Sequence, residues 1–253
     1  MEWALLLLVT FLAATVQSAT GFGFGLIAVS AFLIMLDSVA AIQIVIIITL
    51  IMSCVHWPKL KGLAPAHLLK WLSIGCTLGF PIGVLAYNQL DLEAIKMAVA
   101  VLIILISVQN GWHLLKRQRK DLTPGNEPNP GNEGQRPGAI MGVGVASGLM
   151  ASAMAMPGPA VMLYLSRTSL GKNEIRATIL TFFVFSYAGA LVLQTVFIGI
   201  EIQTWITAGM LTPSALIGVV AGHLLSKKIN QQLFKGLVLL ILLLTGLFMI
   251  FNL

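Results

Sequence analysis

Two short stretches of glycine, proline and small residues carry the chemistry that this sequence suggests. They are Thr20-Gly21-Phe22-Gly23-Phe24-Gly25 and Ala153-Met154-Ala155-Met156-Pro157-Gly158-Pro159. Alternating glycines and paired prolines disfavour a helix, so we expect both stretches to be non-helical breaks. A new helix can begin near Gly25 and near Pro159. Because the first turn of a helix has unpartnered N–H groups and a partial positive charge, two converging N-termini would bind an oxyanion.

Hydroxyl groups and glycines beside the breaks complete this predicted site. Serine and threonine hydroxyls can donate hydrogen bonds to an anion, and glycine lets the backbone approach a ligand closely. The substrate-binding candidates at the breaks are Ser18, Thr20, Gly21, Gly23, Gly25, Ser152, Pro157, Gly158 and Pro159.

Two polar residues away from the breaks are further candidates. Arg176 is the cation nearest to an apolar core segment, where it would either attract an anion at the inner mouth or anchor its segment at the membrane surface. Gln43 would do similar polar work at the outer mouth, although an interhelical hydrogen bond is the favoured explanation. Gln17 and Gln194 are expected to make ordinary hydrogen bonds of that kind.

The composition places the breaks inside a membrane. Hydrophobic residues make up 58% of the 253 residues and charged residues 9%, whereas soluble domains have about 25% charged residues. This length has room for about eight hydrophobic segments and one polar linker, so no separate soluble catalytic domain fits. The function must therefore lie within the membrane.

Six segments are continuous apolar spans, and two are interrupted by the breaks. A 15-residue first arm, from Trp3 to Gln17, would reach only about 22 Å as a helix, against a hydrocarbon core of about 30 Å. Each interrupted segment is therefore expected to be a broken helical hairpin, either re-entrant or made of two short tilted spans. The continuous spans are 39–56, 66–88, 94–113, 177–199, 203–224 and 236–252, and the interrupted segments are 3–36 and 138–166.

The basic residues predict the orientation of the chain. Of 15 Lys and Arg residues, 14 fall in four connections, which the positive-inside rule assigns to the cytoplasm. The longest connection, 116–137, is rich in Pro, Gly and charge and is predicted to be a flexible cytoplasmic linker. It separates a first transmembrane repeat, 1–115, from a second, 138–253. Since the net charge of +6 reports membrane orientation, no nucleic-acid partner is expected.

The two halves match weakly but in order. Gly25 aligns with Gly158 and Gln43 with Arg176 at an offset of 133, and 79–83 aligns with 218–222 at an offset of 139. The span after Gln43 runs toward basic residues and the span after Arg176 runs away from them, so the halves should be inverted. The predicted fold is an all-α polytopic membrane protein with two inverted repeats, each a broken helical hairpin plus three transmembrane helices. Such repeats are typical of secondary transporters with alternating access.

Glycine has a second predicted role. The pairs Gly79/Gly83 and Gly218/Gly222 have the spacing of tight helix packing, and we expect them to serve only that purpose. The alternating glycines of the first break fit no single helix face, which favours a functional role for them.

The spans lack charged and metal-binding groups. No Asp, Glu, Lys or Arg lies well inside a span, and the His and Cys residues have no metal-ligand spacing. This argues against a proton relay, a metal site and a cofactor, so backbone and hydroxyl groups would hold the substrate. The expected partners are a small anion and the lipid bilayer. Coupling to protons or sodium, uniport and homodimer formation are all left open.

The residues at both breaks also carry a family resemblance. The run from Ser18 to Gly25, together with Met156-Pro157-Gly158-Pro159 and Arg176-Ala177-Thr178, resembles the sulfite exporter TauE/SafE family of bacterial membrane permeases. The resemblance covers essentially the whole chain. It implies export of sulfite, an organosulfonate or another small sulfur-containing anion across the bacterial inner membrane, and it adds Thr178 to the candidates. The family pattern usually has more glycine where this chain has Ala-Ser-Ala-Met-Ala-Met at 151–156, which predicts a differently shaped or more apolar pocket.

Two other classes of protein fit parts of the sequence. The first break is similar to the carbonyl-lined filter of a cation channel, but such a filter needs several copies around one axis. Cys54 and Cys76 would suit a membrane thiol–disulfide redox carrier, but both lie in one half and have no counterparts in the other. Without a cluster of His, Asp and Glu, an enzyme is not expected, and the preferred prediction is a secondary transporter.

Overall fold

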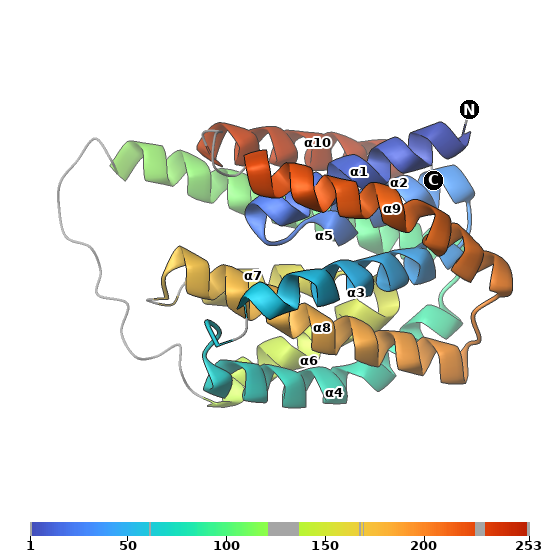
Figure 1. The fold of residues 1–253 in the computed structure, drawn as a ribbon, viewed down its shortest axis with the longest axis horizontal. Helices are drawn as coiled ribbons and strands as arrows, with labels where there is room; N and C mark the ends of the chain where they lie inside the picture. Colours follow the sequence, from blue (N-terminus) through green and yellow to red (C-terminus); the bar gives the residue numbers. More distant parts are fainter. Residues whose placement is uncertain are drawn as a thin grey trace.

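The chain folds into a bundle of apolar helices (Figure 1). The computed structural model describes residues 2–60, 62–120, 137–166, 168, 170–225 and 231–251, and all regular structure in these ranges is helical. Seven of the described helices, namely α1, α3, α4, α5, α6, α8 and α9, are long and apolar enough to cross a membrane. The prediction of an all-α polytopic membrane protein is therefore confirmed. The helices are α1 (Glu2–Thr20), α2 (Phe24–Leu36), α3 (Ala40–Leu60), α4 (Ala66–Gln89), α5 (Leu92–Lys120), α6 (Pro137–Met154), α7 (Gly158–Leu165), α8 (Lys172–Phe197), α9 (Ile202–Leu225) and α10 (Gln231–Phe251).

The predicted central linker falls mostly outside the described residues. Of the stretch 116–137, residues 121–136 are not described, and α5 continues as a helix to Lys120. The basic residues Lys61, Arg136, Arg167, Lys227 and Lys228, on which the predicted orientation partly depends, also lie outside the described residues.

The two halves have the same order of elements. In α1–α5 and again in α6–α10, a first helix is followed by a three-residue break, a shorter helix and three long helices. The first arms are longer than expected, because α1 has 19 residues and α6 has 18, which corresponds to about 28 and 27 Å. This corrects the expectation of a first arm too short to span. The helix continues past Gln17 until Gly21, the first residue with a positive φ.

The tightest helix contacts join one half to the other. A Cβ added to Gly79 would lie 2.1 Å from the Val145 carbonyl oxygen, so α4 and α6 touch backbone to backbone. A Cβ at Gly222 would lie 2.3 Å from the Thr15 carbonyl oxygen, so α9 approaches α1 as closely. The prediction that Gly79/Gly83 and Gly218/Gly222 serve helix packing is confirmed.

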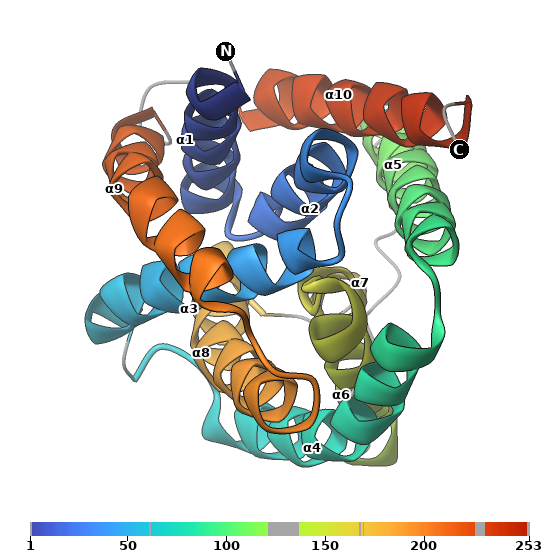
Figure 2. The same ribbon diagram turned by 90° about the vertical axis from the view of Figure 1, so that its right-hand side faces the viewer.

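Each main helix contact between the two halves has a counterpart in which equivalent helices of the two halves have changed places. Contact of α4 with α6 corresponds to contact of α9 with α1, and α3 pairs with α8 as α5 pairs with α10 (Figure 2). Helix α1 runs parallel to α9 and α4 runs parallel to α6, whereas the start of α3 lies at the end of α8. These directions are the ones that an inverted repeat requires, and the repeat itself stays a prediction.

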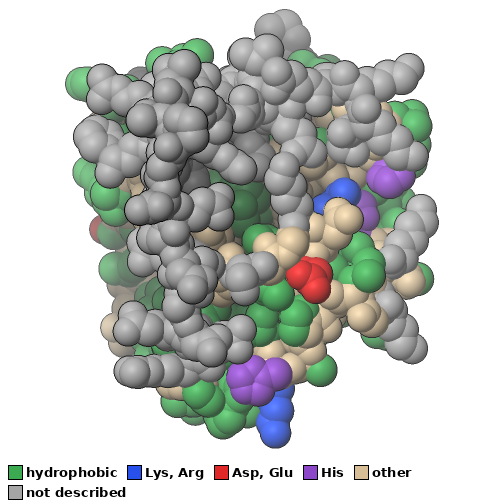
Figure 3. Space-filling model, turned by 90° about the vertical axis from the view of Figure 1, so that its left-hand side faces the viewer, with side chains coloured by type: hydrophobic (Ala, Val, Ile, Leu, Met, Phe, Trp, Pro, Cys, Tyr) green, Lys and Arg blue, Asp and Glu red, His purple; other side chains and the backbone are tan. Residues whose placement is uncertain are grey.

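The short helix α2 lies inside the bundle, and the surface is apolar. Most of α2 is buried, and α3 carries an unbroken run of buried side chains from Ala41 to Ile48. Helices α4 and α5 expose leucine and valine outward, as a lipid-facing surface requires. The end of the molecule shown in Figure 3 carries scattered Lys or Arg and His side chains among hydrophobic ones. On the opposite side of the bundle, Lys96 forms an ion pair with Asp37, which joins α5 to the α2–α3 connection.

Candidate functional site

The first break is a three-residue turn that ends α1 and begins α2. Gly21 and Gly23 have φ values of +93° and +117°, which residues with a side chain rarely adopt. The Gly21 N–H still donates to the Gln17 carbonyl at 2.7 Å, and the Thr20 hydroxyl donates to the Phe22 carbonyl at 2.6 Å. The hydroxyl of Thr20 thus holds the turn in shape.

The second break is closed by an alanine and two prolines. Ala155 takes a left-handed conformation with φ of +54°, and the N–H of Met156 donates to the Met150 carbonyl at 3.0 Å. Pro157 then precedes the first residue of α7, Gly158. The predicted breaks are confirmed. The helices that follow them begin at Phe24 and Gly158, each one residue before the predicted start.

The two breaks touch each other in the centre of the bundle. A Cβ at Gly25 would lie 2.5 Å from the Ala155 carbonyl oxygen, so the first turn of α2 packs directly on the second break. The same carbonyl accepts a hydrogen bond from the Tyr187 hydroxyl at 2.8 Å. A Cβ at Gly158 would meet the Phe183 ring at 3.0 Å and the Phe22 Cβ at 3.7 Å. Glycine is therefore needed on both sides of this contact.

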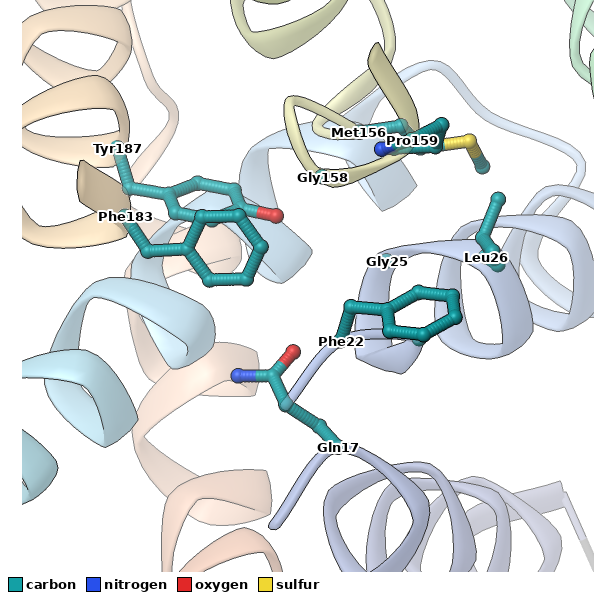
Figure 4. A pocket seen from close by; sticks show the side chains of 10 residues that line it. Gln17, Phe22, Gly25, Leu26, Met156, Gly158, Pro159, Phe183 and Tyr187 are labelled. Carbon is teal, nitrogen blue, oxygen red and sulfur yellow. The ribbon is translucent and has the colours of Figure 1, made fainter. Parts of the chain in front are cut away.

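A small pocket lies where the breaks meet (Figure 4). Its volume is about 10 Å³, close to the minimum that one water molecule needs. Residues from α1, both breaks, α2, α7 and α8 form its wall. They are Gln17, Phe22, Gly23, Gly25, Leu26, Met156, Gly158, Pro159, Phe183 and Tyr187.

The positive end of two helix dipoles faces this pocket. Neither α2 nor α7 has a side-chain cap at its N-terminus, and both N-termini contribute lining residues. The first N–H groups of each helix have no intrahelical partner, and in α7 the proline at position 159 removes one such donor. None of the ten lining side chains is charged. The pocket therefore offers backbone donors and two partial positive charges to a ligand.

Gln17 is the polar side chain that the sequence prediction placed wrongly. It was expected to make an ordinary interhelical hydrogen bond, but neither its Nε2 nor its Oε1 has a hydrogen-bond partner among the described residues. The side chain is 1% exposed and lines the pocket, with its amide pointing between Phe22 and Phe183 (Figure 4). A buried polar group without a partner costs about 1–3 kcal/mol. The sequence feature that could have indicated this role is the position of Gln17, one helical turn before Gly21, where the first break begins.

The predicted serines lie next to the pocket but not in its wall. The Ser18 hydroxyl donates to the Val219 carbonyl of α9 at 2.7 Å. The Ser152 hydroxyl lies 3.0 Å from the Phe80 carbonyl of α4 and 2.9 Å from the Gly148 carbonyl of its own helix. The acceptor residues Phe80 and Val219 occupy matching positions of the two halves at the offset of 139, and the donors Ser18 and Ser152 are one position away from the offset of 133. In this arrangement both hydroxyls hold helices together.

Arg176 holds the end of α1. Its Nη2 donates to the Ser18 carbonyl, and its side chain packs 3.1 Å from the position of a Cβ on Gly21. A guanidinium at a helix C-terminus is favourable because the last carbonyls there lack partners. Its Nε is buried without a partner among the described atoms. Arg176 therefore braces the first break from outside the pocket wall.

The remaining predicted residues are placed as follows. Gly23, Gly25, Gly158 and Pro159 line the pocket, and Gly21, Thr20 and Pro157 form the breaks without lining it. The Thr178 hydroxyl donates to the Glu174 carbonyl within α8 at 2.7 Å. The Gln43 Nε2 donates at 3.1 Å to the carbonyl of Gly199, in the connection between α8 and α9, so it makes a hydrogen bond between two elements but not the expected one between two helices.

Two aromatic residues of α8 were not predicted. Phe183 and Tyr187 are one helical turn apart, so they share a helix face, and their rings pack edge to face at 5.4 Å between centroids. Together they close the pocket on the side opposite Leu26 (Figure 4). Their spacing is visible in the sequence, but the same spacing is common in any buried helix.

The cysteines and the other metal-binding side chains form no further centre in the described part of the chain. Cys54 is exposed, Cys76 is buried, and both are free thiols. No group of three His, Cys, Asp or Glu side chains is close enough to hold a metal ion in the ranges that the structure describes.

A pocket enclosed by two helix breaks, in the core of an apolar multi-span bundle, is the arrangement of a multi-pass membrane transporter. The family model described as sulfite exporter TauE/SafE matches residues 6–249. The chain belongs to the sulfite exporter TauE/SafE family. No curated protein and no solved structure matches the chain.

Proposed function

We propose that the chain is a secondary transporter that exports a small sulfur-containing oxyanion, such as sulfite or an organosulfonate. The observation that carries this proposal is the pocket lined by the uncapped N-termini of both α2 and α7. Two helix N-termini facing one enclosed space provide backbone donors and positive potential for an oxyanion. Membership of a sulfite exporter family supports the class of substrate.

The size of the pocket bears on the transport mechanism. With about 10 Å³ of space, it accommodates a water molecule but not a sulfite ion, which has several heavy atoms. An anion can therefore enter only if the elements around the breaks separate. We propose that this separation occurs alternately toward the two sides of the membrane.

The helix contacts suggest which elements move together. Helix α9 is packed tightly on α1, and α4 on α6, with glycines that leave no room for sliding. Each broken helix and its partner from the other half would thus behave as one body. The contact between the bodies at the pocket, Gly25 on Ala155, would open and close around the anion.

The setting of the transporter follows from the same proposal. The family is bacterial, as the resemblance implies, and the basic connections would face the cytoplasm across the inner membrane, with the linker 116–137 on that side.

Transport into vesicles tests the proposal. We expect the purified chain, reconstituted in vesicles, to move sulfite and organosulfonates, with weaker movement of carboxylates. Gly158→Ala would place a Cβ 3.0 Å from the Phe183 ring and should reduce transport about tenfold. Gly142→Ala in α6 is a matched control, because no atom lies within 4 Å of that Cβ, and it should transport like the wild type.

The same experiment separates the alternatives. If the wild-type protein neither binds nor moves any anion of the panel, the proposal is wrong. Single-channel currents with cation selectivity would favour the channel instead. A redox carrier would lose its activity in Cys54→Ser with Cys76→Ser, whereas the proposed transporter keeps anion transport in that variant.

A further inference from the structure

We infer that the Gln17 carboxamide contacts the transported anion directly and that the pocket selects monoanions over dianions. This inference rests on the proposed transport of an oxyanion, and it names a binding residue and a charge class for that site.

Gln17 differs from two other buried glutamines of the described chain. The Gln43 amide donates to the Gly199 carbonyl at 3.1 Å, and the Gln194 amide donates to the Ser152 carbonyl at 2.8 Å. The amide of Gln17 is just as enclosed, yet both of its polar atoms lack a partner among the described residues. It points into the space that both helix N-termini face (Figure 4). A ligand in the pocket would supply the missing hydrogen bonds.

The charge around the pocket balances a single negative charge. Each helix N-terminus acts as about half a positive elementary charge and each C-terminus as about half a negative one, so the N-termini of α2 and α7 offset the ends of α1 and α6 at the same breaks. None of the lining side chains carries a charge, and the Arg176 guanidinium, which donates to the Ser18 carbonyl outside the wall, leaves a net charge of about +1 beside the pocket. A dianion would bring an uncompensated charge into a buried site, which is strongly unfavourable.

The Gln17 amide gives the site a second way to select among anions, in addition to their charge. Its NH₂ group donates to an anion oxygen, whereas its carbonyl oxygen repels lone pairs and accepts a hydrogen that the ligand carries. Hydrogensulfite is a monoanion with such a hydrogen, and an alkylsulfonate is a monoanion without one. Sulfate and the sulfite dianion lack the matching charge. The charge should therefore admit hydrogensulfite and alkylsulfonates and disfavour sulfate, and the amide oxygen should favour hydrogensulfite over an alkylsulfonate.

Calorimetric titration of the full chain in detergent tests this inference. At a mildly acidic pH, the wild type is expected to bind hydrogensulfite and methanesulfonate, and to bind sulfate at least about tenfold more weakly. Gln17→Met keeps the side-chain length but removes both polar atoms, so affinity for both monoanions should fall about tenfold or more. Gln17→Glu adds a negative charge and should weaken binding further. Gln194→Met is the matched control, because Gln194 is a buried glutamine outside the pocket wall and its loss should leave affinity unchanged.

The outcomes distinguish this inference from the proposed function. No binding of any anion by the wild type would contradict both. Equal affinity for sulfate and methanesulfonate would overturn the charge selection alone. Wild-type affinity in Gln17→Met would overturn the contact with Gln17 while leaving transport intact. If Gln17→Met does not fold, Gln17→Asn keeps the amide one methylene away from its place, and unchanged affinity in that variant overturns the contact equally.

Discussion

The contact between Gly25 and the second break can be tested by adding a single methyl group. In Gly25→Ala the new Cβ would lie 2.5 Å from the Ala155 carbonyl oxygen, 3.4 Å from the Tyr187 hydroxyl and 3.5 Å from the Met156 Cγ. Ordinary contact begins at 3.4 Å, so the backbone carbonyl must retreat by about 0.9 Å. Backbone cannot move aside as a flexible side chain does, and the two breaks must separate.

The expected cost has two parts. Overpacking a close contact costs about 1–3 kcal/mol. Displacing the Ala155 carbonyl also weakens its 2.8 Å hydrogen bond from Tyr187, which contributes about 1 kcal/mol. The free energy of unfolding should therefore fall by about 2–4 kcal/mol. Because the two helix N-termini move apart by nearly the same distance, sulfite affinity should fall about tenfold.

Thermal unfolding in detergent and sulfite titration measure the two effects separately. Gly142→Ala serves as the control, since its Cβ meets open space, and it should unfold within about 1 kcal/mol of the wild type. Gly158→Ala should fall between the two, because its Cβ meets the edge of a phenylalanine ring at 3.0 Å. A Gly25→Ala protein with wild-type stability and affinity would refute the packing of the breaks described above.

Three further substitutions test the packing and the breaks. Gly79→Ala would place a Cβ 2.1 Å from the Val145 carbonyl oxygen, and we expect a loss of about 3 kcal/mol in unfolding free energy, measured by thermal unfolding. Arg176→Ala removes the donor to the Ser18 carbonyl at the end of α1 and should lower the melting temperature, corresponding to about 1–3 kcal/mol; an unchanged melting temperature would contradict this bracing role. Ala155→Gly relieves a left-handed alanine with φ of +54° and should stabilise the protein by about 1 kcal/mol, whereas a destabilised variant would show that the methyl group contributes more by packing than it costs in strain.

Local features of the fold could be predicted from the sequence because they depend on neighbouring residues. Alternating glycines at the first break and two prolines around a glycine at the second disfavour a helix, and this local chemistry predicted both new helix starts to within one residue. The length of the first arms was predicted less well. The residues from Ser18 to Thr20 continue α1 past Gln17, and the helix ends only where Gly21 takes a positive φ.

The candidate site was predicted at the level of its backbone but not of its side chains. Gly25 and Gly158 line the pocket as expected, whereas the Ser18 and Ser152 hydroxyls bond to carbonyls of neighbouring helices. Phe183 and Tyr187 were missed, because two aromatic residues on one face of an apolar helix are equally typical of lipid contact or core packing.

The sequence by itself determined that this chain is a membrane protein with two broken helices, since composition and backbone chemistry are local properties. Only the tertiary structure decided that the breaks touch and which polar atoms face the pocket. Gln17 and Ser18 are adjacent in sequence, yet one faces the pocket and the other bonds to α9. Successive residues point in directions about 100° apart on a helix. The close contact of Gly218 and Gly222 with α1 turns the Ser18 side of that helix toward α9. Gln17 then lies on a different side of α1, the one that faces the pocket.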